Sequence, residues 1–196
     1  MHHGHNTNNT VNPDDTRMGG DYPIFTLTVN RQVSDSPDLP KKLSSFKRYT
    51  LNDVANPNQP VPLAISEGPM SMLINGRGYA DNDVQAFERI KLNSIQLLEI
   101  FHGHNSGHGG MGGGMGMMMS MAHPIHLHGQ YFQILSRSHD HPSDDYNTVK
   151  DGFIDSGFKD TVLIMPGERI KIIKPFQDFK GLFMYHCHNL EHEDMG

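Results

Sequence analysis

The sequence predicts an all-β protein, an antiparallel sandwich or barrel of short strands, and three observations support this fold class. Short apolar runs recur from residue 70 onward, turn residues separate them, and no segment has the convincing periodicity of an amphipathic helix. The spacing of these runs is typical of a β-sandwich. The chain has 196 residues, which is enough for one domain of ordinary size with a tail.

The first predicted strand is YPIFTLTVN, residues 22–30, because apolar and polar residues alternate along it. Residues 31–45 read as a turn-rich connector and residues 56–62 as an extended, proline-rich link, which argues against helix in both. The later strands are expected within residues 71–79, 88–101, 125–135, 160–176 and 181–188.

Turns are expected between these strands at Asn75-Gly76, at residues 91–93 and at Pro166-Gly167. A short helical turn should follow His188, because NLEHEDM shows no strand alternation. Residues 1–20 are polar and rich in Asn and His, so we expect a disordered tail. Residues 102–121 are rich in Met, Gly and His and cannot pack a core, which predicts a mobile surface loop.

Composition and charge argue against some classes of function. The net charge is −6 and no basic stripe is visible, which argues against nucleic acid as a partner. The chain has no run of 18 apolar residues, the length that would predict a membrane span. Its N-terminus also lacks the apolar core of a signal peptide. The protein is therefore expected to be cytoplasmic, to have lost a leader, or to be an internal fragment.

Metal-binding residues are abundant. The chain has 14 His, 13 Met and a single Cys, and this combination indicates copper, because imidazole suits copper and thioether suits Cu(I). A single cysteine cannot form an internal disulfide, so Cys187 is a core thiol, a reactive thiol or a metal ligand.

Two short motifs carry the strongest signal, HPIHLH at residues 123–128 and HCH at residues 186–188. Side chains alternate between the two faces of a strand, so Cys187 faces away from its two histidine neighbours, and His123 has the opposite parity to the other two histidines of its motif. If the motifs are neighbours in one sheet, His123 and Cys187 meet at one site, and a turn brings His192 back to it. A second site would then contain His126, His128, His186 and His188.

The chemistry fits these two sites. Two His and one Cys form the blue-copper electron-transfer site, usually with a weak axial Met, and four His without thiolate suit further copper ions. Cys187 would be bonded to the first copper and linked by peptide bonds to ligands of the second site. Two alternatives remain. In the first, the histidines are surface residues and Cys187 is a small core residue. In the second, the metal is zinc, although a structural zinc site would need more thiolate ligands or one compact tetrahedral set.

With these motifs the sequence resembles the C-terminal domain of a multicopper oxidase, the family of laccases, bilirubin oxidases and cuprous oxidases. The resemblance rests on HPIHLHGQYFQIL, YHCHNLEHEDM and, between them, GFKDTVLIMPGERIKI, and covers roughly residues 60–196. The bacterial laccase and cuprous oxidase branch is the most similar. The resemblance implies a cupredoxin-like Greek-key β-sandwich over residues 61–196, with residues 21–60 as the end of a preceding cupredoxin domain and a linker.

The resemblance also implies roles for single residues. Glu193 would relay protons to oxygen, although it is equally compatible with a solvated carboxylate, and Asp160 would orient the fold or a ligand histidine. About four copper ions would be held by a complete enzyme. The implied ligands are His123, Cys187 and His192 for type 1 copper, His126 for type 2, and His128, His186 and His188 for the binuclear type 3 pair.

The activity implied is one-electron oxidation of Cu(I) or a phenol at type 1 copper, with electrons passing through His-Cys-His to a trinuclear cluster that reduces dioxygen to water. That cluster needs eight histidines in this family and these motifs supply four, so N-terminal cupredoxin domains are expected to supply the rest. The axial ligand would fall one residue past the end of the chain, and Met195 is a possible substitute. Other H-x-H pairs, which lack the family's surrounding residues, are His3/His5, His102/His104 and His139/His141.

The Met-rich loop is expected to cover the type 1 site and to deliver Cu(I), or else to be an insertion with no substrate role. A non-catalytic copper-binding or shuttling fragment that needs a partner chain is the alternative function, and a copper nitrite reductase is disfavoured by the second flanking histidine. The resemblance implies a periplasmic or secreted location. The candidate Cu(I) ligands of the loop are Met111, Met115, Met117, Met118, Met119 and Met121.

Overall fold

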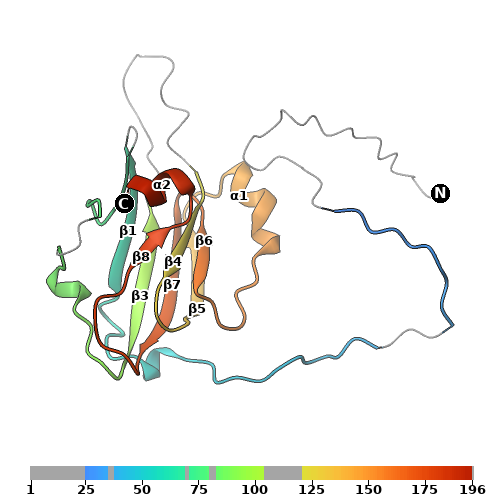
Figure 1. The fold of residues 1–196 in the computed structure, drawn as a ribbon, viewed down its shortest axis with the longest axis horizontal. Helices are drawn as coiled ribbons and strands as arrows, with labels where there is room; N and C mark the ends of the chain where they lie inside the picture. Colours follow the sequence, from blue (N-terminus) through green and yellow to red (C-terminus); the bar gives the residue numbers. More distant parts are fainter. Residues whose placement is uncertain (1–24, 35–37, 69–70, 80–82, 104–120, 196) are drawn as a thin grey trace, which may run out of the picture.

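Two β-sheets packed face to face form the body of the protein (Figure 1). The computed structural model describes residues 25–34, 38–68, 71–79, 83–103 and 121–195. The five-stranded sheet has the order β2-β1-β3-β7-β5, and the three-stranded sheet has the order β6-β4-β8. The strands are β1 (Val61–Gly68), β2 (Ser71–Ile74), β3 (Ser94–His102), β4 (His123–Leu127), β5 (Gln133–His139), β6 (Thr161–Ile164), β7 (Glu168–Phe176) and β8 (Tyr185–Cys187).

The larger sheet is mixed, which corrects the expectation of a purely antiparallel sandwich. β1 pairs with β3 in parallel, with Leu63 opposite Ile100, whereas the other paired strands run antiparallel. A parallel pair needs a crossover connection rather than a hairpin. The chain provides one by passing through β2 and a 3-10 turn at Ala86–Glu88 before β3 begins.

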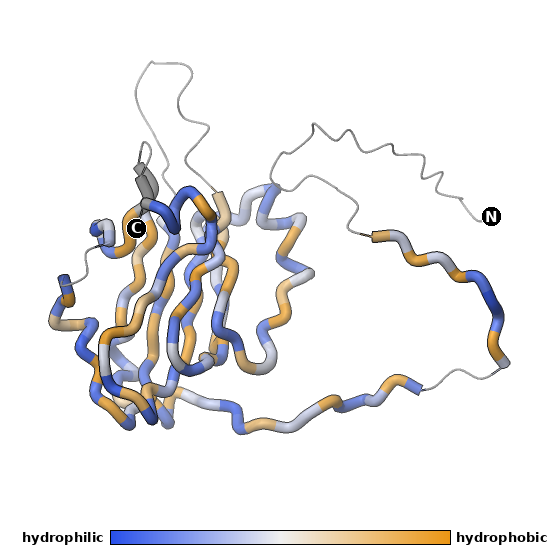
Figure 2. Tube along the Cα trace, in the orientation of Figure 1, coloured by the Kyte–Doolittle hydropathy of each residue, from blue (hydrophilic) through white to orange (hydrophobic). Residues whose placement is uncertain are grey.

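The main core lies between the two sheets. Along β7 the side chains of Ile170 and Ile172 enter this core, whereas that of Ile173 points to the outer face. Figure 2 shows the resulting alternation of polar and apolar residues along the strands. The core also includes Leu63, Ile65, Leu98, Ile100, Ile125, Leu127, Phe132, Ile134, Val162, Ile164 and the thiol of Cys187.

Residues ahead of β1 cover part of the outer face of the larger sheet. Val54 packs on Leu97 and Ile173, Arg48 donates to the carbonyl oxygen of Ile134 at 2.8 Å, and the backbone N–H of Tyr49 donates to Gln133 Oε1 at 3.0 Å. The division of the chain into parts at residues 20 and 60 stays a prediction.

The strand expected over residues 22–30 is wrong for the part that the structure describes. Residues 25–30 are extended without forming a strand, and Phe25, Leu27 and Val29 are 73%, 83% and 92% exposed. Alternation gives a segment the right residues for a sheet, but a strand forms only where a neighbouring backbone satisfies its hydrogen bonds.

β1 is not among the strands that the sequence predicts, because its first residues were expected to belong to the proline-rich link. Its signal was present, because Val61, Leu63 and Ile65 alternate and the last two are buried. The expected turns are confirmed, with positive φ at Asn75 (55°), Asn93 (61°) and Gly167 (80°).

The helical elements are short. The helical turn expected after His188 is confirmed as α2 (Leu190–Met195), whereas α1 (Asp144–Val149) was not predicted. The oxygen of Ser143 caps α1 by accepting from the N–H of Tyr146 at 3.1 Å, so Ser-Asp-Asp was the missed signal. The remaining turns are the 3-10 segments Leu51–Asp53 and Lys150–Gly152. Within the described residues no helix has the length and apolar character to span a membrane.

Candidate metal centre

The two histidine motifs lie side by side because β4 and β8 are neighbours. The strands pair antiparallel, with Ile125 opposite Cys187 and His126 opposite His186. Ile125 and Cys187 face the core, and the paired histidines therefore face the other side of the small sheet. The expectation that these motifs are neighbours in one sheet is confirmed.

The first cluster contains His123, Cys187 and His192, whose donor atoms all lie within 4.8 Å of one another. The sulfur of Cys187 is 3.5 Å from Nδ1 of His123 and 3.7 Å from Nδ1 of His192. His123 and Cys187 are fully buried and His192 is half-buried, so the cluster reaches the surface at only one ligand.

The start of α2 shapes this first cluster. The N–H of His192 donates to the carbonyl oxygen of Asn189 at 2.9 Å, which turns the chain back toward the sulfur. The backbone N–H of Asn189 donates to Cys187 Sγ at 3.3 Å and so orients it. A short helix directly after the strand therefore allows a residue five positions beyond the cysteine to share its site.

The second cluster lies on the other side of β8. His128 Nε2 and His186 Nε2 are 3.1 Å apart, and the imidazole rings of this cluster have neighbouring centroids 4.7–5.5 Å apart. Donor atoms of His126, His128 and His186 lie within 4.8 Å of one another. The four histidines that parity assigned to one site, His126, His128, His186 and His188, thus share one face.

His126 is held in a form that can bind a metal. Burial lowers its pKa, the charges of His128 and His186 lower it further, and the carboxylate of Asp160 opposes them. Its Nδ1 lies 3.0 Å from Thr161 Oγ1, a contact that fixes the ring. A neutral, oriented imidazole is the form that ligates metals.

Glu193 stands at the edge of the second cluster. Its Oε2 is 3.4 Å from Nδ1 of His188, and the side chains are 43% and 44% exposed, respectively. Donor atoms of His186, His188 and Glu193 also lie within 4.8 Å of one another. An acid in this place can hold a proton beside the cluster, and its relay role stays a prediction.

The other candidate histidines and methionines lie outside the two sets of donor atoms or outside the described residues. His102 lies beside His123 at the first cluster, a neighbour that sequence reasoning missed because the contact joins two different sheets. His139 contacts the carbonyl oxygen of Pro166 at 2.7 Å and packs on Tyr146. The candidate ligands and H-x-H residues of the sequence analysis that lie outside the described part are His3, His5, His104, Met111, Met115, Met117, Met118 and Met119, together with the side chain of Met195.

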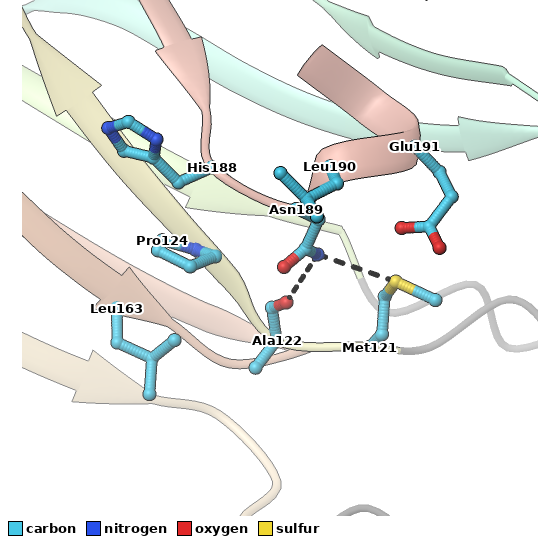
Figure 3. Close-up of a pocket in the computed structure, with 8 residues that line it drawn as sticks. All are labelled: Met121, Ala122, Pro124, Leu163, His188, Asn189, Leu190 and Glu191. Atoms are coloured by element: carbon cyan, nitrogen blue, oxygen red, sulfur yellow. Dashed lines mark hydrogen bonds between the residues drawn. The ribbon is translucent and has the colours of Figure 1, made fainter. Parts of the chain in front are cut away.

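A shallow pocket of about 480 Å³ is lined by residues next to His123 and Cys187 in sequence and includes His188 of the second cluster (Figure 3). The amide of Asn189 bridges it by donating to the carbonyl oxygen of Ala122 at 3.0 Å and to the thioether of Met121 at 3.5 Å. The walls also include His188, Leu163, Pro124 and the first turn of α2.

A larger cavity of about 880 Å³ borders the second cluster at His128 and His186. Lys174 also lines it; burial lowers the pKa of this lysine to about 8, and the charge of Asp160 opposes the shift. The hydroxyl of Tyr185 donates to Glu88, and burial is the largest reason why the pKa of this tyrosine is raised.

Comparisons with known proteins agree with this geometry. A family model described as multicopper oxidase matches residues 113–196, which contain both motifs. A multicopper oxidase of Staphylococcus aureus is 40% identical over 180 residues, which are 91% of this chain and 31% of that protein. The chain contains a multicopper oxidase domain.

Further relatives agree with this assignment. A laccase of Haloferax volcanii is 31% identical over 130 residues, 66% of this chain and 18% of the laccase. The crystal structure of a multicopper oxidase from Pediococcus acidilactici has a TM-score of 0.59 and 25% identity, covering 83% of this chain and 29% of that one. The cupredoxin-like fold expected from the sequence is therefore confirmed.

The chain spans less than a third of the length of the curated relatives first compared with it. Its donor sets fit copper, because one thiol with two imidazoles suits a blue-copper site and a face of imidazoles suits further copper ions. The assignment of single residues to type 1, type 2 and type 3 copper stays a prediction.

Proposed function

We propose that this chain carries the reductant-oxidising half of a copper-dependent oxidase that reduces dioxygen to water. The observation that supports it is the place of Cys187. Its sulfur belongs to the first cluster, while the residues on either side of it, His186 and His188, belong to the second. A single tripeptide therefore joins the two sites covalently and gives electrons a short path.

The roles of the side chains follow from this geometry. His123, Cys187 and His192 would hold the type 1 copper, and His126, His128, His186 and His188 would hold their share of a trinuclear cluster. Copper, when bound, would supply the one-electron redox chemistry that thiols and imidazoles lack. Glu193 would hold a proton at Oε2, within reach of His188 Nδ1.

A partner domain should complete the second cluster. Two imidazoles of the second cluster, those of His128 and His186, line a large cavity, and apolar side chains remain exposed at its rim, with Phe179 at 73% and Leu182 at 67%. Exposed apolar surface of this kind is typical of an interface with another domain. The proposed occupant is an N-terminal cupredoxin domain that supplies the remaining histidines.

The proposed reductant is Cu(I) or a phenol. Support for Cu(I) comes from the thioether of Met121, which lines the pocket of Figure 3 two residues before His123, because thioethers suit Cu(I). We also propose an exported location, periplasmic or secreted, as the family resemblance implies. Deleting residues 105–120 should lower Cu(I) oxidation and spare the oxidation of bulky phenols, whereas an equal loss of both activities would contradict a role in substrate delivery.

Copper content and the absorption spectrum, measured on the native assembly, test the proposal. About four coppers per unit, an intense blue thiolate band and a near-ultraviolet type 3 shoulder are expected. Cys187→Ser should abolish the blue band. One copper or none, without a type 3 signal, would instead favour the alternative function, a non-catalytic copper-binding or shuttling fragment that needs a partner chain.

A further inference from the structure

His102 ends β3 in the five-stranded sheet, yet its ring lies against a residue of the three-stranded sheet. The ring centroids of His102 and His123 are 4.9 Å apart and their planes differ by 26°. The two residues are 2% and 0% exposed, so this contact is buried. It joins the two sheets at the first cluster, although His102 is not among the donor groups that could share a metal ion in the described residues.

The backbone of His102 is held from two directions. In the parallel pairing of β1 and β3 it stands opposite Ile65. Its carbonyl oxygen accepts the N–H of Gly167 at 3.0 Å, from the turn that leads into β7. A buried residue anchored on both sides can move little, so its ring presents a rigid surface to His123.

His123 depends on such a surface. Its Nδ1 must stay beside Cys187 Sγ, 3.5 Å away, and its ring also lies 5.0 Å from that of His192. The groups that orient a ligating ring typically matter 10–100-fold for metal affinity. Of the residues that contact His123, His102 comes from the opposite sheet and so couples the ring to the sandwich as a whole.

We propose that His102 is a positioning residue of the type 1 site, which fixes the ring plane of His123 by packing against it. The inference rests on the proposed copper function. The imidazole of His102 acts through its flat shape. The phenyl ring of phenylalanine at residue 102 should therefore substitute for the imidazole, whereas the methyl group of alanine should not. It also gives the first histidine of the H-G-H segment a role apart from the second cluster.

The test uses the full chain in its native assembly and three variants. His102→Ala should weaken copper binding at the type 1 site roughly tenfold and change its visible band, its electron paramagnetic resonance spectrum and its reduction potential. His102→Phe should restore all four readouts. Phe46→Ala is the matched control, because Phe46 also packs on an aromatic ring, that of Phe158, and neither residue belongs to the donor groups of the two clusters, so it should leave them unchanged.

Two results would overturn the inference, an alanine variant with wild-type affinity and spectra, or a phenylalanine variant as impaired as the alanine one. His102→Leu, which fills the space without a flat ring, is used if the alanine variant does not fold. A wild-type chain without a blue band would refute the proposed function instead. The positioning role is then decided in metal-free protein, where His102→Ala, unlike His102→Phe and Phe46→Ala, must weaken the nuclear Overhauser contacts between the ring of His123 and the side chain of Cys187.

Discussion

The hydroxyl group of Thr161 is expected to hold a ligand of the second cluster, and its removal isolates that cluster from the first. Thr161 begins β6, and its Oγ1 lies 3.0 Å from Nδ1 of His126, directly across the pairing of β4 and β6. Thr161→Val keeps the branched shape of the side chain and removes this hydrogen bond. The ring of His126 then loses its fixed orientation, while the site at Cys187 is on the other face of the small sheet.

The size of the effect follows from that single contact. One side-chain hydrogen bond contributes about 1 kcal/mol to stability, so the fold should survive. Loss of a group that orients a ligating histidine typically costs 10–100-fold in metal affinity. We therefore expect Thr161→Val to release copper from the second cluster at roughly 10–100-fold lower chelator concentration, with the blue thiolate band preserved.

The assay is titration of the loaded assembly with a chelator, following copper content, the blue band and the near-ultraviolet shoulder in parallel. Thr148→Val is the matched control, because its hydroxyl donates to the carbonyl oxygen of Asp145 at 2.7 Å on an exposed helix. Equal copper retention in Thr161→Val and wild type would refute the reasoning. So would parallel loss of the blue band and the shoulder, since the two sites would not then be separate.

Three further predictions follow from the described residues. Glu193→Gln should slow dioxygen reduction roughly 100-fold at unchanged copper content, measured as oxygen uptake, and an unchanged rate would exclude proton relay by this acid. Lys174 has its pKa lowered by burial from 10.5 to about 8, so the unfolded state binds more protons between these values and the free energy of unfolding rises over that pH range. The rise should be roughly 2–3 kcal/mol in chemical denaturation and absent in Lys174→Met; a flat wild-type profile would contradict it. Ile164→Ala should lower the free energy of unfolding by roughly 2–5 kcal/mol because Ile164 is fully buried, whereas Leu182→Ala, 67% exposed, should change it by less than about 0.5 kcal/mol.

Much of the second half of the fold was predictable, because local patterns there agree with tertiary packing. The runs containing β4, β6, β7 and β8 are strongly alternating or apolar, and turn residues such as Asn93 and Gly167 take the positive φ that their type permits. The segment at residues 25–30 shows the opposite case. Its alternation is as clear as that of β1, yet it forms no strand, because strand formation depends on a neighbour that the local sequence does not specify.

Strand parity made both clusters predictable in outline. Alternation separates Cys187 from His186 and His188 whatever the rest of the fold does, since successive side chains in a strand point to opposite faces. The sequence by itself therefore determined which donors could share a site, and the donor types determined copper as the metal they suit.

Only the tertiary structure decided which strands are neighbours and which side chains meet across the sheets. The pairing of β4 with β8 brings residues 60 positions apart into one site, and the packing of the two sheets sets His102 against His123. It also placed Thr161 beside His126 and left His128 and His186 at the wall of a cavity. Such contacts depend on long-range packing, in which loop lengths and the shapes of many buried side chains act together, so no local pattern in the chain encodes them.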